Sequence, residues 1–153
     1  MSLGLISGRV LNMVEHAVVG SRNALRVLIV EDDDDTRRLL KIALRSRDFL
    51  VDDAGNADLA WQKIVDFLPD VVLLDVMIPG SMDGIGICER LNGADSPVRS
   101  KVIVISGKTG DDDLERGRKA QADAYILKPF SPLQMIETID WVLKDTTVRL
   151  KNE

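Results

Sequence analysis

From Arg26 onward, short apolar runs alternate with longer stretches in which apolar residues recur every three to four positions. Short runs rich in Val, Ile and Leu predict β-strands, and the longer spacing predicts amphipathic helices. Regular alternation of the two is typical of βα units wound into a parallel sheet. The predicted strands are Arg26–Val30, Leu50–Asp53, Val71–Leu74, Lys101–Ile105 and Ala124–Leu127, and the predicted helices are Asp34–Ser46, Ala57–Phe67, Ile85–Leu91, Asp112–Ala120 and Pro132–Leu143.

Two of these strands indicate where the middle of the sheet lies. The third and fourth predicted strands are continuously apolar once Lys101 is passed. A strand with apolar side chains on both sides needs cover on both of its faces, so these two belong near the centre. We therefore predict an α/β fold, a doubly wound parallel sheet with helices on both sides.

Polar residues follow four of the five predicted strands. In an open α/β sheet, ligands bind outside the carboxyl ends of the strands. Glu31 and Asp32 follow the first strand, Asp75 the third, Ser106 the fourth and Lys128 the fifth. Carboxylates, a hydroxyl and an ammonium group at one edge are the components of a magnesium-dependent phosphoryl-transfer site.

Residues 1–25 do not follow the alternation. Apolar residues spaced three to four apart predict a short helix near Arg9–Val19, although Gly4 and Gly8 disfavour its first turns. The segment is interpreted either as a signalling or dimerising helix that joined an upstream domain, or as an arm that packs on its own domain or remains from expression. His16, the single histidine, has no partner cluster and is expected to be solvated.

Composition narrows the class of protein. The chain has 153 residues, 45% of them hydrophobic, which predicts one globular domain. Its net charge is −5 and no basic stripe with interleaved aromatics occurs, so no direct nucleic-acid binding is expected. No run approaches the ~20 apolar residues of a membrane helix, and no secretion signal is visible. The single cysteine, Cys88, is expected to be buried in a protein of the reducing cytoplasm.

Four motifs stand at the strand ends in a characteristic order. They are Val27–Asp33 (VLIVEDD), Leu73–Pro79 (LLDVMIP), Val104–Gly107 (VISG) and Tyr125–Phe130 (YILKPF). Together they resemble the response-regulator receiver domain of two-component signal transduction, over about Arg26–Lys144. The resemblance implies a flavodoxin-like sheet of five strands in the order 2-1-3-4-5, and a phosphoacceptor signalling domain that is not an enzyme.

The resemblance assigns the acidic residues. It implies that Asp75 accepts a phosphoryl group and forms an acyl phosphate. It implies Mg²⁺ as the cofactor, held by Asp32, Asp75 and the Met77 backbone carbonyl, with Glu31 binding through water or directly.

Three further residues receive roles from the same resemblance. Lys128 is expected to pair with the phosphoryl oxygens, and Ser106 to donate a hydrogen bond to one of them. Tyr125 is expected to swing between outward and inward rotamers as Ser106 moves, which makes the pair a switch. The family often carries a cis peptide at the position of Lys128–Pro129. The plainer alternatives are that Lys128 is a surface lysine and that Tyr125 is a half-buried residue of its strand.

The implied partners are proteins. A histidine kinase or a phosphotransfer protein would donate the phosphoryl group, and a downstream effector would bind the face made by the fourth helix, fifth strand and fifth helix; a homodimer is a further option. Residues 26–145 are expected to form the receiver, 1–25 the arm or linker, and 146–153 a C-terminal tail. The signal is expected to pass to a partner protein. The chain is interpreted either as a stand-alone receiver or as a piece of a longer protein.

Two runs of acids need a structural interpretation as well. Asp33, Asp34 and Asp35 stand where the first helix begins, and carboxylates there are favoured by capping and by the helix dipole. The same interpretation covers Asp111–Asp113 ahead of the fourth helix.

One departure and two rival functions stay open. The loop 79–84 is one residue longer than the family spacing, which affects donor access, and Met77 predicts a long-lived phosphoryl group because Met cannot orient a water. Asp32–Thr36 spells the D-x-D-x-T motif of haloacid-dehalogenase-like phosphatases, but that function leaves Asp75 without a role. The other rival is a receiver-like interaction module that is never phosphorylated.

Overall fold

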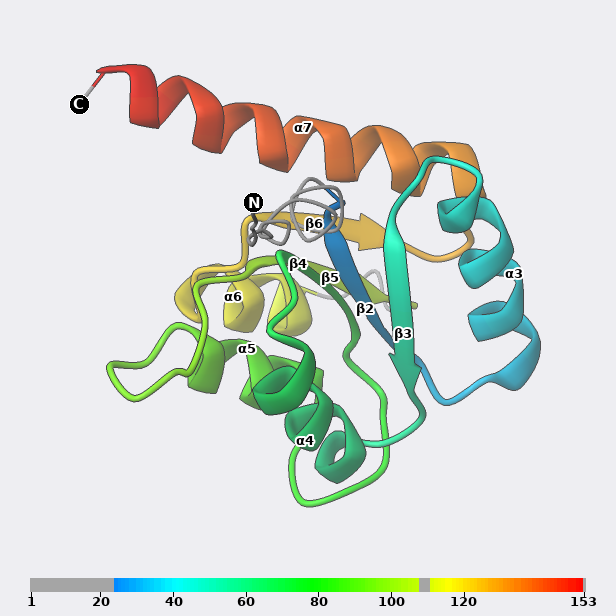
Figure 1. Cartoon of the computed structure of the whole chain (residues 1–153). Coiled ribbons are helices and arrows are strands. Elements are labelled where there is room, and N and C mark those ends of the chain that lie inside the picture. Colours follow the sequence, from blue (N-terminus) through cyan, green and yellow to red (C-terminus); the bar gives the residue numbers. More distant parts are fainter. Residues whose placement is uncertain (1–23, 108–110, 153) are drawn as a thin grey trace, which may run out of the picture.

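The computed structural model describes residues 24–107 and 111–152. Within these ranges, strands and helices alternate strictly (Figure 1). The helix predicted near Arg9–Val19 lies outside the described residues. The elements are β2 (Arg26–Val30), α3 (Asp34–Arg45), β3 (Leu50–Ala54), α4 (Ala57–Phe67), β4 (Val71–Asp75), α5 (Gly84–Leu91), β5 (Lys101–Ser106), α6 (Asp111–Lys119), β6 (Ala124–Leu127) and α7 (Pro132–Asn152).

The five strands form one parallel sheet in the order β3-β2-β4-β5-β6. Counted along the chain this is the predicted order 2-1-3-4-5, and β4 lies in the middle. The chain passes from β2 outward to β3, then returns to β4 and continues in the opposite direction. The strand order therefore reverses between β2 and β4, which is where open α/β sheets bind their ligands.

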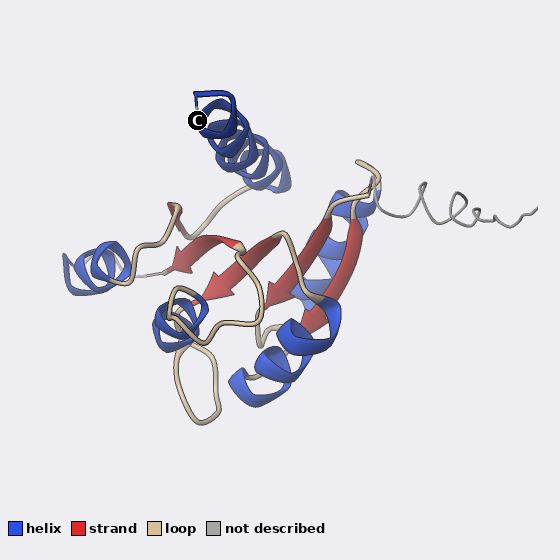
Figure 2. Ribbon diagram, turned by 60° about the vertical axis from the view of Figure 1, so that its left-hand side comes forward, coloured by secondary structure: helices blue, strands red, loops and turns tan. Residues whose placement is uncertain are grey.

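Helices cover both faces of the sheet (Figure 2). The side chains of the sheet alternate between two apolar cores, one on each face. Leu28 and Val30 of β2 point into the core that α4 and α5 cover, and Val27 and Ile29 point into the core that α3 and α7 cover. Every residue of β4 is buried, as its apolar run predicts. This two-sided cover holds the ends of β2 and β4 rigidly beside each other.

Most predicted boundaries agree with the structure to within a residue or two. β4 and β5 each run one residue further than predicted, so Asp75 and Ser106 are the last residues of their strands. Because their backbones belong to the sheet, these two side chains are placed by rigid strands and not by loops.

The largest difference is helix α7, which was predicted to end at Leu143 and continues to Asn152. No proline or glycine occurs between Leu133 and Asn152, so nothing in the sequence stops the helix. The segment predicted as a tail is thus helical as far as Asn152. Despite this length, no helix in the described ranges is both long and apolar enough to cross a membrane.

Cys88 lies on the buried side of α5, as expected. Burial raises the pKa of its thiol to about 12. A protonated, buried thiol is a packing residue and a poor nucleophile.

Candidate functional site

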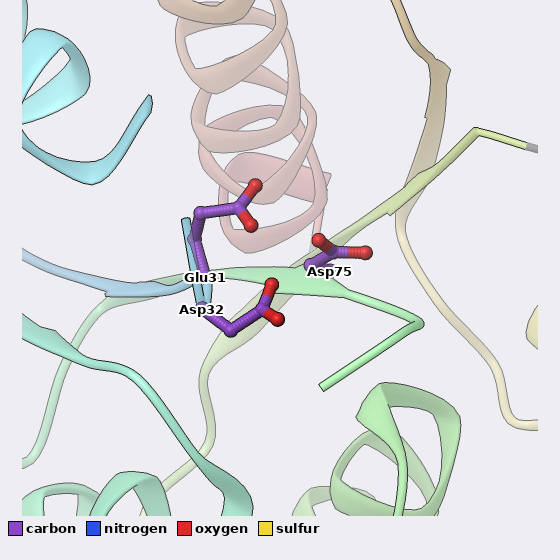
Figure 3. A group of neighbouring side chains, drawn as sticks. All are labelled: Glu31, Asp32 and Asp75. Carbon is purple, nitrogen blue, oxygen red and sulfur yellow. The ribbon is translucent and has the colours of Figure 1, made fainter. Parts of the chain in front are cut away.

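Three carboxylates meet at the carboxyl edge of the sheet. Glu31 and Asp32 follow β2, and Asp75 ends β4, the neighbouring strand. One carboxylate oxygen from each lies within 4.8 Å of the others (Figure 3). Glu31 and Asp75 are buried whereas Asp32 is exposed, so the pocket is open to solvent on one side. The structure thus brings together the three acids that the sequence assigned to a metal.

Lys128 follows β6 and extends into the same pocket. Its Nζ lies 2.8 Å from Asp75 Oδ2 and 3.1 Å from Glu31 Oε1. Burial alone would lower the pKa of Lys128, but the hydrogen bonds and charges of the two carboxylates raise it overall. Lys128 is therefore a fixed cation against Asp75. The Lys128–Pro129 peptide bond is cis.

Glu31 has an unusual environment for a carboxylate. Burial, and then the neighbouring Asp75, raise the pKa of Glu31 to about 7, against the opposing effects of the Asp33 N–H and Lys128. Glu31 Oε2 accepts the Asp33 N–H at 3.2 Å. Its Oε1 is buried and receives no well-aligned hydrogen bond from the described part of the chain.

This donor set fits a hard divalent cation. One ammonium group does not neutralise three clustered carboxylates, and the buried Glu31 Oε1 has only the shared Lys128 ammonium beside it, in poor hydrogen-bond geometry. Mg²⁺ is bound in proteins by a few carboxylate and carbonyl oxygens together with water. The residues present therefore suit Mg²⁺, with Asp32 on the solvent side.

The loop after β4 contacts both the acidic pocket and helix α4. The Met77 N–H donates to Asp75 Oδ1 at 3.0 Å, and the Met77 side chain is exposed. Further along, Ser81 Oγ donates to Asp58 Oδ1 at 2.6 Å, so the loop rests on the first turn of α4.

Ser106 and Tyr125 lie together on the adjacent strands β5 and β6. Ser106 is fully buried. The Tyr125 hydroxyl is buried as well, and this burial raises its pKa, while the nearby Ser106 hydroxyl has the opposite effect. The Tyr125 ring packs against α6, where a Cβ at Gly117 would lie 3.0 Å from Cε2. The two residues assigned to a switch are thus in contact range.

The interpretation of Asp111–Asp113 was incomplete. All three stand within the first turn of α6, and Asp113 is buried with 7% exposure. Asp113 Oδ2 accepts the Ser106 hydroxyl at 3.1 Å. The sequence does carry a signal, because positions 113, 117 and 120 form the inward stripe of a helix and all three are buried.

In the first run of acids, Asp33, Asp34 and Asp35 lie at the start of helix α3, as expected. Asp33 caps α3 by accepting the Thr36 N–H at 2.8 Å. Asp34 and Asp35 form ion pairs with Arg37 and Arg38 on the same helix. Asp34 and Thr36 are the second Asp and the Thr of the phosphatase-like motif, and both form contacts at the start of α3, away from the pocket. The phosphatase alternative therefore has no geometric support.

Comparison with known families identifies the family to which this fold belongs. Residues 27–140 match the response regulator receiver domain. The chain belongs to this family. Its receiver domain is similar to the DNA-binding response regulator MtrA of Mycolicibacterium smegmatis, with 36% identity over 114 residues that cover 74% of this chain and 48% of that protein. The phosphate regulon transcriptional regulatory protein PhoB of Pseudomonas aeruginosa is 35% identical over 120 residues, covering 78% and 52% respectively.

Solved receiver structures agree. A CheY-like response regulator receiver domain protein from Methanospirillum hungatei superposes with a TM-score of 0.76 at 28% identity, covering 83% of this chain and 99% of that one. The chain spans about half the length of the curated relatives it matches. As a receiver domain of the two-component type, it is a signalling rather than a catalytic domain.

Proposed function

We propose that Asp75 accepts a phosphoryl group from a phosphohistidine on a histidine kinase or a phosphotransfer protein. The observation that carries the proposal is the position of Asp75, buried beside two further carboxylates with Lys128 Nζ 2.8 Å from its Oδ2. Family membership implies a histidine kinase as the partner.

The chemistry follows from this arrangement. An Asp75 oxygen attacks phosphorus in line; the O–P bond forms as the P–N bond breaks, and its electron pair leaves on the imidazole nitrogen. Mg²⁺, when held by Asp32, Asp75, Glu31 and the Met77 carbonyl, supplies counter-charge to the phosphoryl oxygens. Lys128 already lies against Asp75 and needs only a small movement to donate to the same oxygens.

The proposed output is a switch that ends at the α6–β6–α7 face. Ser106 donates to a phosphoryl oxygen when one is present, and Tyr125 adjusts to the new position of Ser106. Exposed apolar side chains occur on each of these elements, at Leu114, Leu127 and Trp141. Such side chains suit an effector protein or a second copy of the domain.

A groove beside Lys128 supports docking of the donor protein. It is mostly apolar, has a volume of about 400 Å³ and adjoins the phosphoacceptor pocket. The groove is lined by Thr36, Leu39, Leu40, Lys128, Pro129, Phe130 and Pro132.

We place the domain in the cytoplasm because its one thiol requires no oxidising compartment.

Intact mass spectrometry after incubation with acetyl phosphate and Mg²⁺ tests the proposal. We expect a single adduct of about 80 Da. Asp75→Asn should abolish it, since the attacking oxygen is lost. Asp32→Asn should slow its formation and leave the acceptor in place, because only a proposed metal ligand changes.

Two results would contradict the phosphoacceptor assignment. No adduct on the wild type, despite measured Mg²⁺ binding and addition of a phosphorylated histidine phosphotransfer protein, would favour an interaction module that is never phosphorylated. Continuous phosphate release that survives Asp75→Asn and fails in Asp32→Asn would favour the phosphatase.

The exposed Met77 side chain predicts a slow loss of the phosphoryl group. A thioether cannot orient an attacking water, whereas an amide can. Met77→Asn should therefore hydrolyse the acyl phosphate faster, by about tenfold, as measured by the decay of the adduct after acetyl phosphate is removed. Met77→Leu is the matched control, and an equal decay rate in Met77→Asn and wild type would refute the explanation.

A further inference from the structure

The Ser106 hydroxyl is directed at a carboxylate outside the phosphoacceptor pocket. Ser106 Oγ donates to Asp113 Oδ2 at 3.1 Å, and both residues are buried. Hydrogen bonds to a carboxylate are stronger than neutral ones, and burial strengthens them further. Asp113 is therefore a strong acceptor for the hydroxyl proton that the phosphoryl group also needs.

Arg116, on the same helix as Asp113, lies near its carboxylate and binds a neighbouring loop. Arg116 Nη1 lies 4.0 Å from Asp113 Oδ1, and Arg116 Nη2 donates to Asp83 Oδ2 at 2.8 Å. Asp83 in turn caps α5, directly after the loop that carries Met77. A polar chain thus joins the Ser106 hydroxyl to the far end of the loop that borders Asp75.

We propose that Asp113 is a positioning residue that holds the Ser106 hydroxyl away from the phosphoacceptor pocket in the resting domain. This inference rests on the proposed function, because it assumes that Ser106 binds the phosphoryl group on Asp75. A hydroxyl has one proton to donate. Phosphorylation must therefore break the Ser106–Asp113 hydrogen bond, so Asp113 sets how strongly the domain resists activation.

Beryllofluoride, a phosphoryl mimic, tests this by titration in the presence of Mg²⁺, with the bound fluorides counted by ¹⁹F NMR. Asp113→Ala is expected to lower the half-saturating concentration about tenfold, the scale of one charge-assisted hydrogen bond. Asp113→Asn retains an acceptor oxygen without the charge, so its half-saturating concentration should fall between those of Asp113→Ala and wild type. Asp112→Ala, on the exposed side of the same turn, is the matched control.

A double-mutant cycle with Ser106→Ala separates positioning from charge. With no hydroxyl to hold, Asp113→Ala should bring no gain in that background. Equal half-saturation in wild type and Asp113→Ala would overturn the inference. So would a full gain in Asp113→Asn, or a gain that persists without the Ser106 hydroxyl, because either result assigns the effect to the negative charge alone.

Two further controls complete the test. Urea unfolding checks that each variant is folded; if Asp113→Ala is not, Asp113→Leu repeats the experiment with a side chain of similar volume. Wild-type protein that fails to bind beryllofluoride would overturn the proposed function itself, and with it the inference. That outcome is distinct from normal wild-type binding with an unchanged Asp113→Ala.

Discussion

Gly84→Ala is expected to destabilise the domain by about 3 kcal/mol or more, with loss of the ordered acidic pocket around Asp75. A Cβ on Gly84 would lie 2.2 Å from the Asp75 carbonyl oxygen and 2.8 Å from its carbonyl carbon. Both atoms belong to strand β4 at the centre of the sheet, so they cannot yield without moving the strand. Glycine is required here because α5 begins directly against the Asp75 backbone, and the Gly84 N–H donates to the Val76 carbonyl at 3.0 Å.

Gly86→Ala is the matched control, two residues along the same helix. Its Cβ would lie 3.0 Å from Met82 Cβ, which belongs to the loop before α5, so a shift of a few tenths of an ångström in that loop relieves the contact. Because Ala also favours the helix over Gly, we expect a change within about 1 kcal/mol. Urea unfolding of both variants measures the difference. Equal stability of the two variants would show that the start of α5 relaxes, contrary to a tight fit against β4.

Lys128→Met is expected to reduce phosphoryl transfer from acetyl phosphate at least a hundredfold. Removing one preorganised donor to a developing anion typically costs 10²–10³ in rate, and Lys128 supplies the ammonium group that contacts Asp75 and Glu31. The initial rate of adduct formation by intact mass measures this directly.

We also expect Mg²⁺ to stabilise Lys128→Met more than it stabilises wild type. Without Lys128 the two buried carboxylates lose their cation, so the metal-free variant should be less stable than metal-free wild type. Addition of Mg²⁺ should therefore raise the stability of the variant by the larger amount. Lys101→Met is the control, because Lys101 forms an ion pair with Asp123 at the other end of β5. A Lys128→Met protein that Mg²⁺ stabilises no more than wild type would contradict the expectation that Lys128 and Mg²⁺ both offset the charge of the buried carboxylates.

The sequence alone determined the architecture and the main members of the site. Two periods of apolar residues distinguish strands from helices, and a continuously apolar run such as Val71–Leu74 requires cover on both faces, which places β4 centrally. Given a parallel sheet, the residues after its strands must meet at one edge. Asp32, Asp75 and Lys128 were therefore found without knowledge of any distance.

Only the tertiary structure decided which side chains support that site. Asp113 looked like another helix-start acid, and its contact with Ser106 depends on how α6 packs against β5. The need for glycine at position 84 arises from the approach of α5 to β4, which no local pattern encodes. Arg37 likewise joins the Glu31 carbonyl to Asp53 on another strand. Periodicity is a local property of the chain and can be read from sequence, whereas these contacts depend on the packing of segments that are distant in sequence.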